Sequence, residues 1–421
     1  MEHRGAGPRE HPPASPFGLT GVHVRGYRSL KDTSFRPGTI SAIVGGPSTG
    51  KSNLLTAIWA LLDPSAAPLS TEDLPEEGRS STGQIRIVGE LAGGTTIAVA
   101  GAPPEPSSAE GSPRPPALFF PAELRDGPIV APAGPGAASH PVAELIRTAV
   151  DRTASESWAL PAGTTASPHG LVAGLESWHE AGIGGVIVLM EEPELFLPPQ
   201  AERYLYRLLR LVASQGNQVL YSTHSPAFLN VVRLDELVFT ERRPKVGTLL
   251  LQPEPLAADE EFRAFSEFDS SRSELFLARA AVLVEGLTEK LTLPFVFEAL
   301  GHDPDRERIS IIECGGKGNI PLFGRISKAV GLPFVAVHDR DAPEGAEPSE
   351  AEALLNALIA EVAGHDRVEL TPDFEGVAGI HGDRQKPARA WRRFADLGAE
   401  DVPEPLAEIV ERAVALAKRE P

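Results

Sequence analysis

A glycine-rich octapeptide near the start of the chain has the residue types that bind phosphate. It reads Gly45-Gly46-Pro47-Ser48-Thr49-Gly50-Lys51-Ser52 and lies between the apolar run 39–44 and a segment with helical apolar spacing. In such a strand–loop–helix setting, backbone N–H groups and the helix N-terminus face the phosphates. The lysine reaches the β- and γ-oxygens, and the serine holds Mg²⁺. The octapeptide therefore predicts an ATP site, with Lys51 on the phosphates and Ser52 on the metal ion.

Two carboxylates that suit ATP hydrolysis directly follow a second apolar run, 186–190. Hydrolysis needs one carboxylate that positions the metal ion and one that polarises the attacking water. We assign these roles to Glu191 and Glu192, in that order. His224 follows a further predicted strand, 218–221, and is a candidate contact of the γ-phosphate. A histidine at such a place is by itself more often an ordinary loop residue, but the presence of the other motifs favours a contact with the nucleotide.

A second group of carboxylates lies in the C-terminal part of the chain. Glu285 follows the predicted strand 281–284, Glu289 lies one helical turn further on, and Asp339 and Asp341 follow the strand 334–337. Because the carboxyl ends of neighbouring parallel strands meet at one crevice, we expect these side chains to converge. Alternate residues of an extended chain share a side, so Asp339 and Asp341 are expected to hold one or two Mg²⁺ ions together. Two such ions would stabilise the attacking and leaving oxygens of a phosphodiester.

The elements that position these residues predict an α/β protein of two domains, as the length of 421 residues suggests. Short apolar strands alternate with helical segments, the pattern of a parallel sheet covered by helices. We expect a disordered leader at 1–18, an ATPase domain at 19–240 with a Pro-rich surface excursion at about 102–141, a linker at 241–273 and a second domain at 274–421. The strand-like 118–120 lies inside the excursion. The closing helix, 404–419, has an apolar face for core packing or a dimer surface.

Composition narrows the class of protein. A single cysteine excludes a disulfide framework, and no apolar stretch of roughly 18 residues is present, so we expect a cytoplasmic protein without a membrane anchor. The formal net charge of −19 is a caution against nucleic-acid binding. Carboxylates that bind divalent ions no longer carry a net negative charge that opposes DNA binding, however. A local basic strip can also still bind DNA. Such a strip is formed by Arg384, Arg389, Arg392 and Arg393, with an ordinary solvated helix face as the alternative.

The N-terminal motifs resemble those of the ABC-type ATPase heads of the SMC, RecF and OLD (overcoming lysogenization defect) group. The resemblance covers about 21–240 and includes the opening segment 24–30. It implies that ATP binds between two copies, so that the chain forms a homodimer or a higher homo-oligomer through its heads. It also implies a serine that caps the ATP of the other copy. Ser167 is the candidate, although Ser167-Pro168-His169-Gly170 departs from the usual Ser-Gly-Gly form.

The C-terminal motifs resemble those of a TOPRIM domain, and their amino-acid sequence is similar to the OLD-family version. The match covers about 274–394 and rests on the segments 283–289, 315–319 and 339–341. The resemblance implies that Glu285 is a general base or metal ligand, and that Glu289, Asp339 and Asp341 are metal ligands. It further implies an acidic ligand at Glu375, and a transition-state contact at Lys386. The interval from 375 to 386 is shorter than in the larger members, and 52–186 leaves little room for their dimerisation insert.

An ABC-type P-loop ATPase head followed by a TOPRIM-like parallel-sheet domain is similar to a compact OLD-family ATP-dependent endonuclease. This implies DNA as substrate, ATP and Mg²⁺ or Mn²⁺ as cofactors, and a setting in phage defence or DNA repair. Two other classes stay open. One is a non-nucleolytic ATP-driven DNA clamp or regulator, which the acidic balance and the short interval favour. The other is a TOPRIM activity on RNA or in primer synthesis, against which the lack of zinc-binding cysteines counts.

Overall fold

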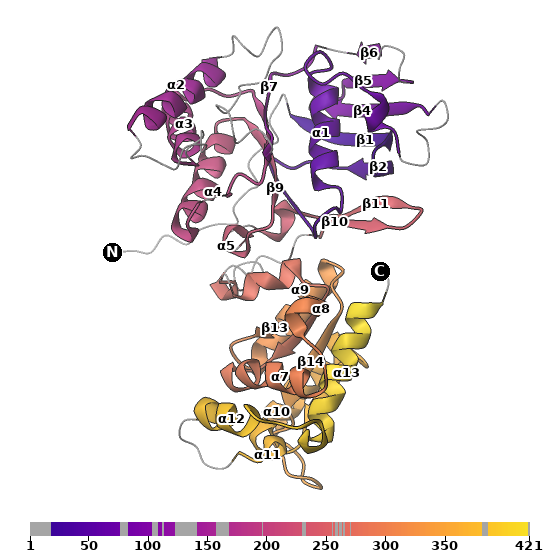
Figure 1. Cartoon of the computed structure of the whole chain (residues 1–421), viewed down its shortest axis with the longest axis vertical. Helices are drawn as coiled ribbons and strands as arrows, with labels where there is room; N and C mark the ends of the chain where they lie inside the picture. Colours follow the sequence, from indigo (N-terminus) through magenta and orange to yellow (C-terminus); the bar gives the residue numbers. More distant parts are fainter. Residues whose placement is uncertain are drawn as a thin grey trace. The chain divides into compact units, whose positions relative to one another are not determined.

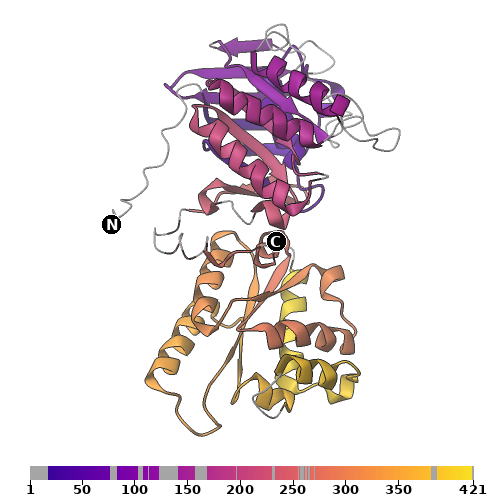
Figure 2. The same ribbon diagram turned by 90° about the vertical axis from the view of Figure 1, so that its left-hand side faces the viewer.

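The computed structural model describes residues 18–75, 83–102, 108–111, 113–122, 141–156, 168–195, 197–229, 233–254, 256, 260, 263, 266–269, 271–380 and 386–419. The chain divides into two compact units, Met1–Gln252 and Pro253–Pro421 (Figures 1 and 2). Each unit has its own sheet system and its own apolar core. The two candidate sites therefore belong to separate units.

The described part of the first unit holds two sheets. A six-stranded sheet has the order β11-β10-β3-β9-β8-β7, and a five-stranded sheet has the order β2-β1-β4-β5-β6. The strands of the larger sheet are β3 (Ile40–Val44), β7 (Ala117–Phe120), β8 (Ile187–Glu191), β9 (Gln218–Thr223), β10 (Leu237–Arg243) and β11 (Gly247–Leu251). The strands of the smaller sheet are β1 (Leu19–Tyr27), β2 (Leu30–Phe35), β4 (Ile85–Leu91), β5 (Thr96–Gly101) and β6 (Ser108–Gly111). Pairing is parallel from β10 through β3, β9 and β8 to β7, and antiparallel elsewhere.

One helix, α1 (Lys51–Leu62), lies between the two sheets (Figure 1). A helix with apolar neighbours on both sides must be apolar nearly all round, and most of its residues are buried. The other helices in the described part of this unit are α2 (Pro141–Glu156), α3 (Pro168–Ala181), α4 (Pro199–Ser214), α5 (Pro226–Leu229), η1 (Thr71–Asp73) and η4 (Leu234–Glu236). Figure 2 shows helices packed over the outer face of the larger sheet. Because α1 is buried between the two sheets, its first turn is held at the sheet edge where β3 ends.

The second unit has a four-stranded sheet of the order β13-β12-β14-β15, parallel throughout. Its strands are β12 (Ala280–Val284), β13 (Ile309–Glu313), β14 (Phe334–Asp339) and β15 (Arg367–Leu370). The helices among its described residues are η5 (Arg272–Leu277), α7 (Leu287–Ala299), α8 (Pro304–Glu307), η6 (Lys317–Asn319), α9 (Ile320–Ala329), α10 (Glu350–Ala363), α11 (Phe374–Ala378), α12 (Lys386–Phe394), η7 (Ala399–Asp401) and α13 (Glu404–Lys418). Helices α7, α12 and α13 contribute to one apolar core with the sheet, while α9 and α10 pack on β14.

The predicted α/β fold class and the predicted strands are confirmed, with ends that shift by one or two residues. The strand expected at 118–120 is β7, at the edge of the larger sheet. The apolar face expected for the last helix belongs to the core of the second unit. The expected linker begins too early, because β10 and β11 continue the first unit's sheet to Leu251. Residues 1–17 of the expected leader, and most of the Pro-rich excursion, lie outside the described residues.

Within the described ranges, none of the helices has the length and apolar character needed to cross a membrane.

Candidate nucleotide site and candidate metal site

The glycine-rich octapeptide forms the loop between β3 and α1. All residues of β3 are buried, so the loop starts at a fixed point of the sheet. Gly50 has φ 108°, and a Cβ at this position would lie 2.2 Å from Thr248 Oγ1. This position therefore requires glycine for two reasons, a left-handed backbone and close approach by β11. The loop has the strand–loop–helix geometry that the sequence predicted.

The ammonium group of Lys51 is held by the loop itself. Its Nζ donates to the carbonyl oxygens of Gly45 at 3.0 Å and Gly46 at 2.9 Å. Only 5% of the residue is exposed. Since these carbonyls are neutral acceptors, a phosphate oxygen can offer the ammonium a stronger, charge-assisted bond. Ser52 is exposed at the start of the helix, where an anion also meets the helix N-terminus.

Glu191, Glu192 and His224 lie at the same sheet edge, because β8 and β9 are the next strands after β3. The register pairs Val44 with Thr223 and Glu191 with Ser222, so the three strands end nearly level. Glu191 is 7% exposed, and its Oε2 accepts the N–H of Ala122 at 3.0 Å. Glu192 has φ 42°, and its Oε1 lies 3.7 Å from His224 Nε2. The structure therefore brings together three of the side chains predicted for the nucleotide site.

Glu194 is a residue of this edge that the sequence did not single out. Its Oε1 accepts the hydroxyl of Thr223 and, at 3.0 Å, the backbone N–H of His224. The carboxyl group ties the loop after β8 to the loop that carries His224. Burial raises the pKa of Glu194 to about 7. A short-range sequence pattern could not show this, because the contact joins residues about thirty positions apart.

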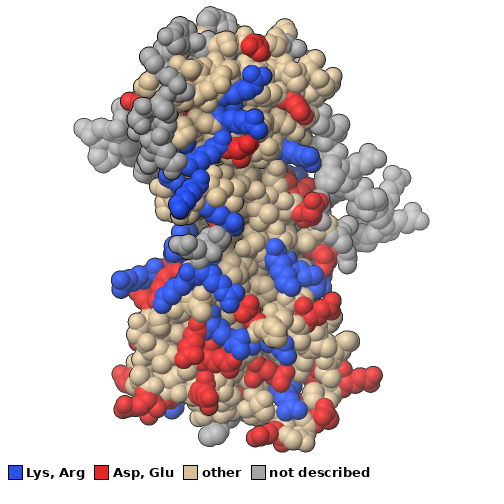
Figure 3. Space-filling view, turned by 90° about the vertical axis from the view of Figure 1, so that its right-hand side faces the viewer, with Lys and Arg blue, Asp and Glu red and all other residues tan. Residues whose placement is uncertain are grey.

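A basic pocket of about 680 Å³ adjoins the start of α1. Among its lining residues are Arg28, Lys31, Asn53, Arg243 and Lys245, from the β1–β2 turn, the start of β2, α1 and the β10–β11 hairpin. Figure 3 shows Lys and Arg side chains gathered on this face of the first unit. Thr248, which follows the pocket-lining residue Gly247, contacts the phosphate loop, since its hydroxyl donates to the carbonyl of Thr49 at 2.8 Å.

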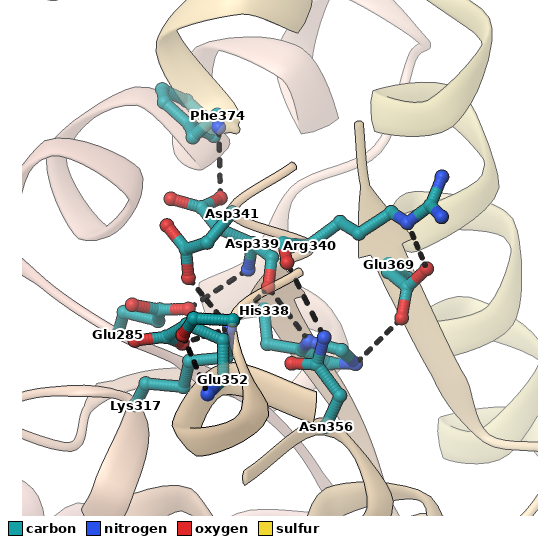
Figure 4. Close-up of polar contacts among 11 residues, drawn as sticks. Glu285, Lys317, His338, Asp339, Arg340, Asp341, Glu352, Asn356, Glu369 and Phe374 are labelled. Atoms are coloured by element: carbon teal, nitrogen blue, oxygen red, sulfur yellow. Dashed lines mark hydrogen bonds and ion pairs between the residues drawn. The ribbon is translucent and has the colours of Figure 1, made fainter. Parts of the chain in front are cut away.

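In the second unit, Glu285 and Asp339 meet at the ends of the adjacent strands β12 and β14 (Figure 4). Oε1 of Glu285 accepts the backbone N–H of Asp339 at 2.8 Å. Oδ1 of Asp339 accepts the N–H of Phe374 at 2.8 Å, at the start of α11. The convergence predicted from parallel strand ends is therefore present.

Burial dominates the acid–base properties of this pair. It raises the pKa of Glu285 to about 7, against smaller opposing effects of the Asp339 N–H and the Lys317 charge. It raises the pKa of Asp339 to about 8, and the negative charges of Glu285 and Glu289 add to that rise. Carboxyl groups that retain protons near neutrality because they are buried together bind a cation readily once the protons leave.

The predicted alternation of Asp339 and Asp341 on one extended strand is wrong. Strand β14 ends at Asp339, and Asp341 has φ 59°, outside the extended region. Its backbone N–H donates to the carbonyl of Pro372 at 2.9 Å. The side chain instead reaches Lys317, whose Nζ lies 2.6 Å from Asp341 Oδ2. Both aspartates still contribute to one acidic centre, since the Asp341 charge also raises the pKa of Asp339.

Glu289 on α7 and Glu375 on α11 are linked to this centre by their charges, since Glu289 raises the pKa of Asp339 and Glu375 raises the pKa of Glu289. Glu289 is 7% exposed, and burial, followed by the charge of Glu375, raises its pKa. Within the part of the chain that the structure describes, no three acidic, His or Cys side chains already form a cluster that could hold a metal ion. The donor chemistry nevertheless fits a hard divalent cation, because all five predicted ligands are carboxylates.

Metal binding at this centre should depend on pH. Because the folded-state pKa values of Glu285 and Asp339 are raised to about 7 and about 8, the folded chain binds more protons than the unfolded chain above pH about 4. Stability without metal therefore falls as pH rises through this window. A divalent ion binds the deprotonated form, so we expect saturating Mg²⁺ to raise Tm by about 5–10 °C at pH 8.5 and much less at pH 6. An equal shift at both pH values, or a shift that persists in Asp339→Asn, would contradict this.

Two predicted residues lie partly or wholly outside what the structure describes. Ser167 directly precedes α3 and is outside the described residues. Lys386 begins α12, which packs against α7, but the placement of its side chain is not described. The basic strip is helical as predicted, with Arg389, Arg392 and Arg393 exposed on α12, whereas 384 lies outside the described ranges.

Together, the loop after β3 and the carboxylates after β8 define the first unit as a P-loop ATPase, and the acidic centre on parallel strands defines the second as TOPRIM-like. Comparison with known proteins agrees. Residues 276–341 match the model of the overcoming lysogenization defect protein-like TOPRIM domain, and residues 179–230 match that of an AAA domain. Domains of these two kinds generally use divalent metal and ATP.

Curated relatives extend these matches. The OLD nuclease of Thermus scotoductus is 34% identical over 263 residues, which are 57% of this chain and 50% of the relative. The Old nuclease of Escherichia phage P2 is 25% identical over 198 residues, 44% of this chain and 34% of the relative. Among solved structures, the SMC head domain from Thermotoga maritima is 16% identical to this chain. The match has a TM-score of 0.37 and covers 56% of this chain and 99% of that structure.

The resemblance to the OLD nucleases is thus confirmed, and the chain joins an ATPase domain to an OLD-like TOPRIM domain. It spans about half the length, or less, of the curated relatives it matches.

Proposed function

We propose that the chain is an ATP-regulated, divalent-metal-dependent endonuclease that acts on DNA. The observation that carries this proposal is the acidic centre at the ends of β12 and β14, within a region that matches an OLD-like TOPRIM domain. The presence of a P-loop ATPase unit in the same chain supports control by ATP.

At the ATPase site, Lys51 would exchange its loop carbonyls for phosphate oxygens of ATP. Ser52 and Glu191 would hold Mg²⁺, Glu192 would orient the attacking water, and His224 would contact the γ-phosphate. Asn53 and the basic pocket beside it would receive the rest of the nucleotide, since the pocket continues from the first turn of α1. Heads of this kind imply a homodimer, or a larger homo-oligomer, with ATP between the copies.

At the TOPRIM site, Glu285, Glu289, Asp339, Asp341 and Glu375 would hold Mg²⁺ or Mn²⁺. When bound, the metal supplies Lewis-acid stabilisation of the charge that develops on the phosphodiester oxygens. Glu285 lies beside Asp339 with a pKa of about 7, which suits a group that also accepts a proton near neutral pH. Lys386 would stabilise the transition-state charge from the start of α12.

The exposed arginines of α12 would contact the DNA backbone. Arg389, Arg392 and Arg393 lie at helical spacings of three and four, and Trp391, which is 54% exposed on the same helix, would offer a stacking surface for a base. Each phosphate contact contributes about 0.9 to the slope of log affinity against log salt. We expect replacement of the three arginines by alanine to weaken duplex binding and to reduce the slope by about 2–3, as measured by fluorescence anisotropy in EDTA.

The matched control replaces Arg306, Lys328 and Lys418 by alanine, three exposed cations of the same unit away from α12. This control changes the net charge equally and should leave the salt slope nearly unchanged. An unchanged slope in the α12 variant would remove the strip from the proposal.

Regulation by ATP is tested separately from cleavage itself. We expect DNA affinity and cleavage rate to differ among ATP, ADP and no nucleotide, because ATP binding at paired heads would gate access to the metal site. If the three conditions give the same affinity and the same rate, regulation by ATP has to be dropped while the nuclease remains.

A further inference from the structure

Glu194 joins the two loops that carry Glu192 and His224. It is 5% exposed and lies in the turn between β8 and α4. Its Oε1 accepts the Thr223 hydroxyl at 2.5 Å and the backbone N–H of His224 at 3.0 Å. Its Oε2 is buried and has no hydrogen-bond partner among the residues that the structure describes. A single carboxyl oxygen therefore makes both contacts with the loop of His224.

The contacts of Glu194 fix the backbone from which the imidazole of His224 extends. Thr223 ends β9 and is fully buried, and its Oγ1 also accepts the N–H of Ser225 at 3.1 Å. Ser225 Oγ in turn accepts the N–H of Phe228 at 3.2 Å, so the loop is held on both sides of His224. The side chain of His224 is 38% exposed. The loop thus gives the imidazole a fixed point of attachment at the edge where the nucleotide is expected.

The turn that carries Glu192 is bound to the same loop. The backbone N–H of Glu192 donates to the carbonyl oxygen of Ser222 at 2.9 Å, and two residues later Glu194 accepts from His224. Glu192 has φ 42°, a backbone conformation that persists in a residue other than glycine only where the surroundings hold it. Because the turn is bound on both sides of Glu192, the position of His224 relative to Glu192 depends on the contacts of Glu194.

We propose that Glu194 is a positioning residue for ATP hydrolysis, which holds the imidazole of His224 opposite Glu192. Glu194 has no assigned contact with the nucleotide and acts through His224. Burial raises the pKa of Glu194 to about 7, so the carboxyl group can carry a proton near neutral pH and still offer Oε1 as an acceptor. This inference rests on the proposed contact between His224 and the γ-phosphate.

The test measures single-turnover hydrolysis at saturating ATP and, separately, ATP affinity. Glu194→Ala removes two hydrogen bonds, so we expect hydrolysis to fall by about tenfold while ATP affinity stays unchanged. Glu194→Gln keeps an acceptor oxygen in a side chain of the same shape and should retain the native rate. In the His224→Ala chain, Glu194→Ala should cause no further loss, because the two residues act as one unit.

The matched control is Gln215→Ala. Gln215 also joins two segments through its side chain, since its Nε2 donates to the carbonyl oxygen of His179 at 2.7 Å. Its Oε1, too, is buried without a partner in the described part of the chain. It follows α4 and precedes β9, at the end of that strand opposite to Thr223. Hydrolysis by Gln215→Ala should be unchanged, even where Tm falls as it does in Glu194→Ala.

The outcomes separate this inference from the proposed function. A native rate in Glu194→Ala, an equal loss in Glu194→Gln or Gln215→Ala, or a further loss in the double variant would overturn the role of Glu194. Each of these results would leave the ATPase site intact. A native rate in His224→Ala would instead overturn the proposed contact with the γ-phosphate, and this inference with it.

A second variant covers the case in which Glu194→Ala does not fold. Thr223→Val keeps the shape of the buried side chain and removes only the hydroxyl shared by Glu194 and Ser225. We expect hydrolysis to fall by about threefold, and the loss should disappear in the His224→Ala chain. A native rate in Thr223→Val, or a loss that adds to that of His224→Ala, would overturn the inference.

Discussion

Replacement of Asp339 by asparagine is expected to lower metal-dependent DNA cleavage by at least about a hundredfold, since a catalytic metal is worth several kcal/mol of transition-state stabilisation. The side chain lies at the meeting point of the centre, beside Glu285 and under the N-terminus of α11. Asparagine keeps the oxygen that accepts the Phe374 N–H and loses the negative charge, so the fold is expected to persist. The measurement is the initial rate of cleavage with Mg²⁺ or Mn²⁺, together with ATP hydrolysis.

The matched control is Glu361→Gln, which removes an exposed carboxylate of α10 in the same unit. Its cleavage rate should equal that of the native chain. ATP hydrolysis should be retained in both variants, because the ATPase site lies in the other unit. Native cleavage in Asp339→Asn would mean that the acidic centre is not the nuclease site.

Replacement of Glu192 by glutamine is expected to lower ATP hydrolysis by about a hundredfold to ten-thousandfold, the range that a positioned base contributes. Glu192 follows β8 and faces His224 at 3.7 Å. Because the phosphate loop is untouched, ATP binding should persist, whereas Lys51→Ala should lose binding as well. Single-turnover hydrolysis and nucleotide binding distinguish these two variants.

Glu180→Gln serves as the control for this site, since it removes an exposed carboxylate near the end of α3. Hydrolysis should be unchanged in that variant. If Glu192→Gln hydrolyses ATP at the native rate, the assignment of Glu192 must pass to another carboxylate of the same edge, of which Glu191 is the first choice.

The parts of the two sites that the sequence predicted depend on short-range rules. The octapeptide 45–52 is contiguous, and Glu285 and Asp339 each end an apolar strand, so the parallel-sheet rule was enough to bring them together. The last helix was predictable because its apolar spacing is regular over 404–418.

The parts that the sequence missed depend on contacts between distant segments or on unusual backbone. The basic pocket joins residues near 28, 53 and 243, and no local pattern connects them. Glu352 enters the TOPRIM centre from α10 only through Lys317. The orientation of Asp341 follows from a left-handed backbone at a residue other than glycine, which the chain tolerates because its N–H bonds to Pro372.

The measurement that tests the central claim most directly is cleavage of supercoiled plasmid DNA with Mg²⁺ or Mn²⁺, with and without ATP, by the native chain, Asp339→Ala and Lys51→Ala. We predict nicking or linearisation by the native chain, loss of both in Asp339→Ala, and cleavage that no longer responds to ATP in Lys51→Ala. No cleavage by the native chain under any of these conditions, with ATP hydrolysis intact, would contradict the account and favour a non-nucleolytic, ATP-driven DNA clamp.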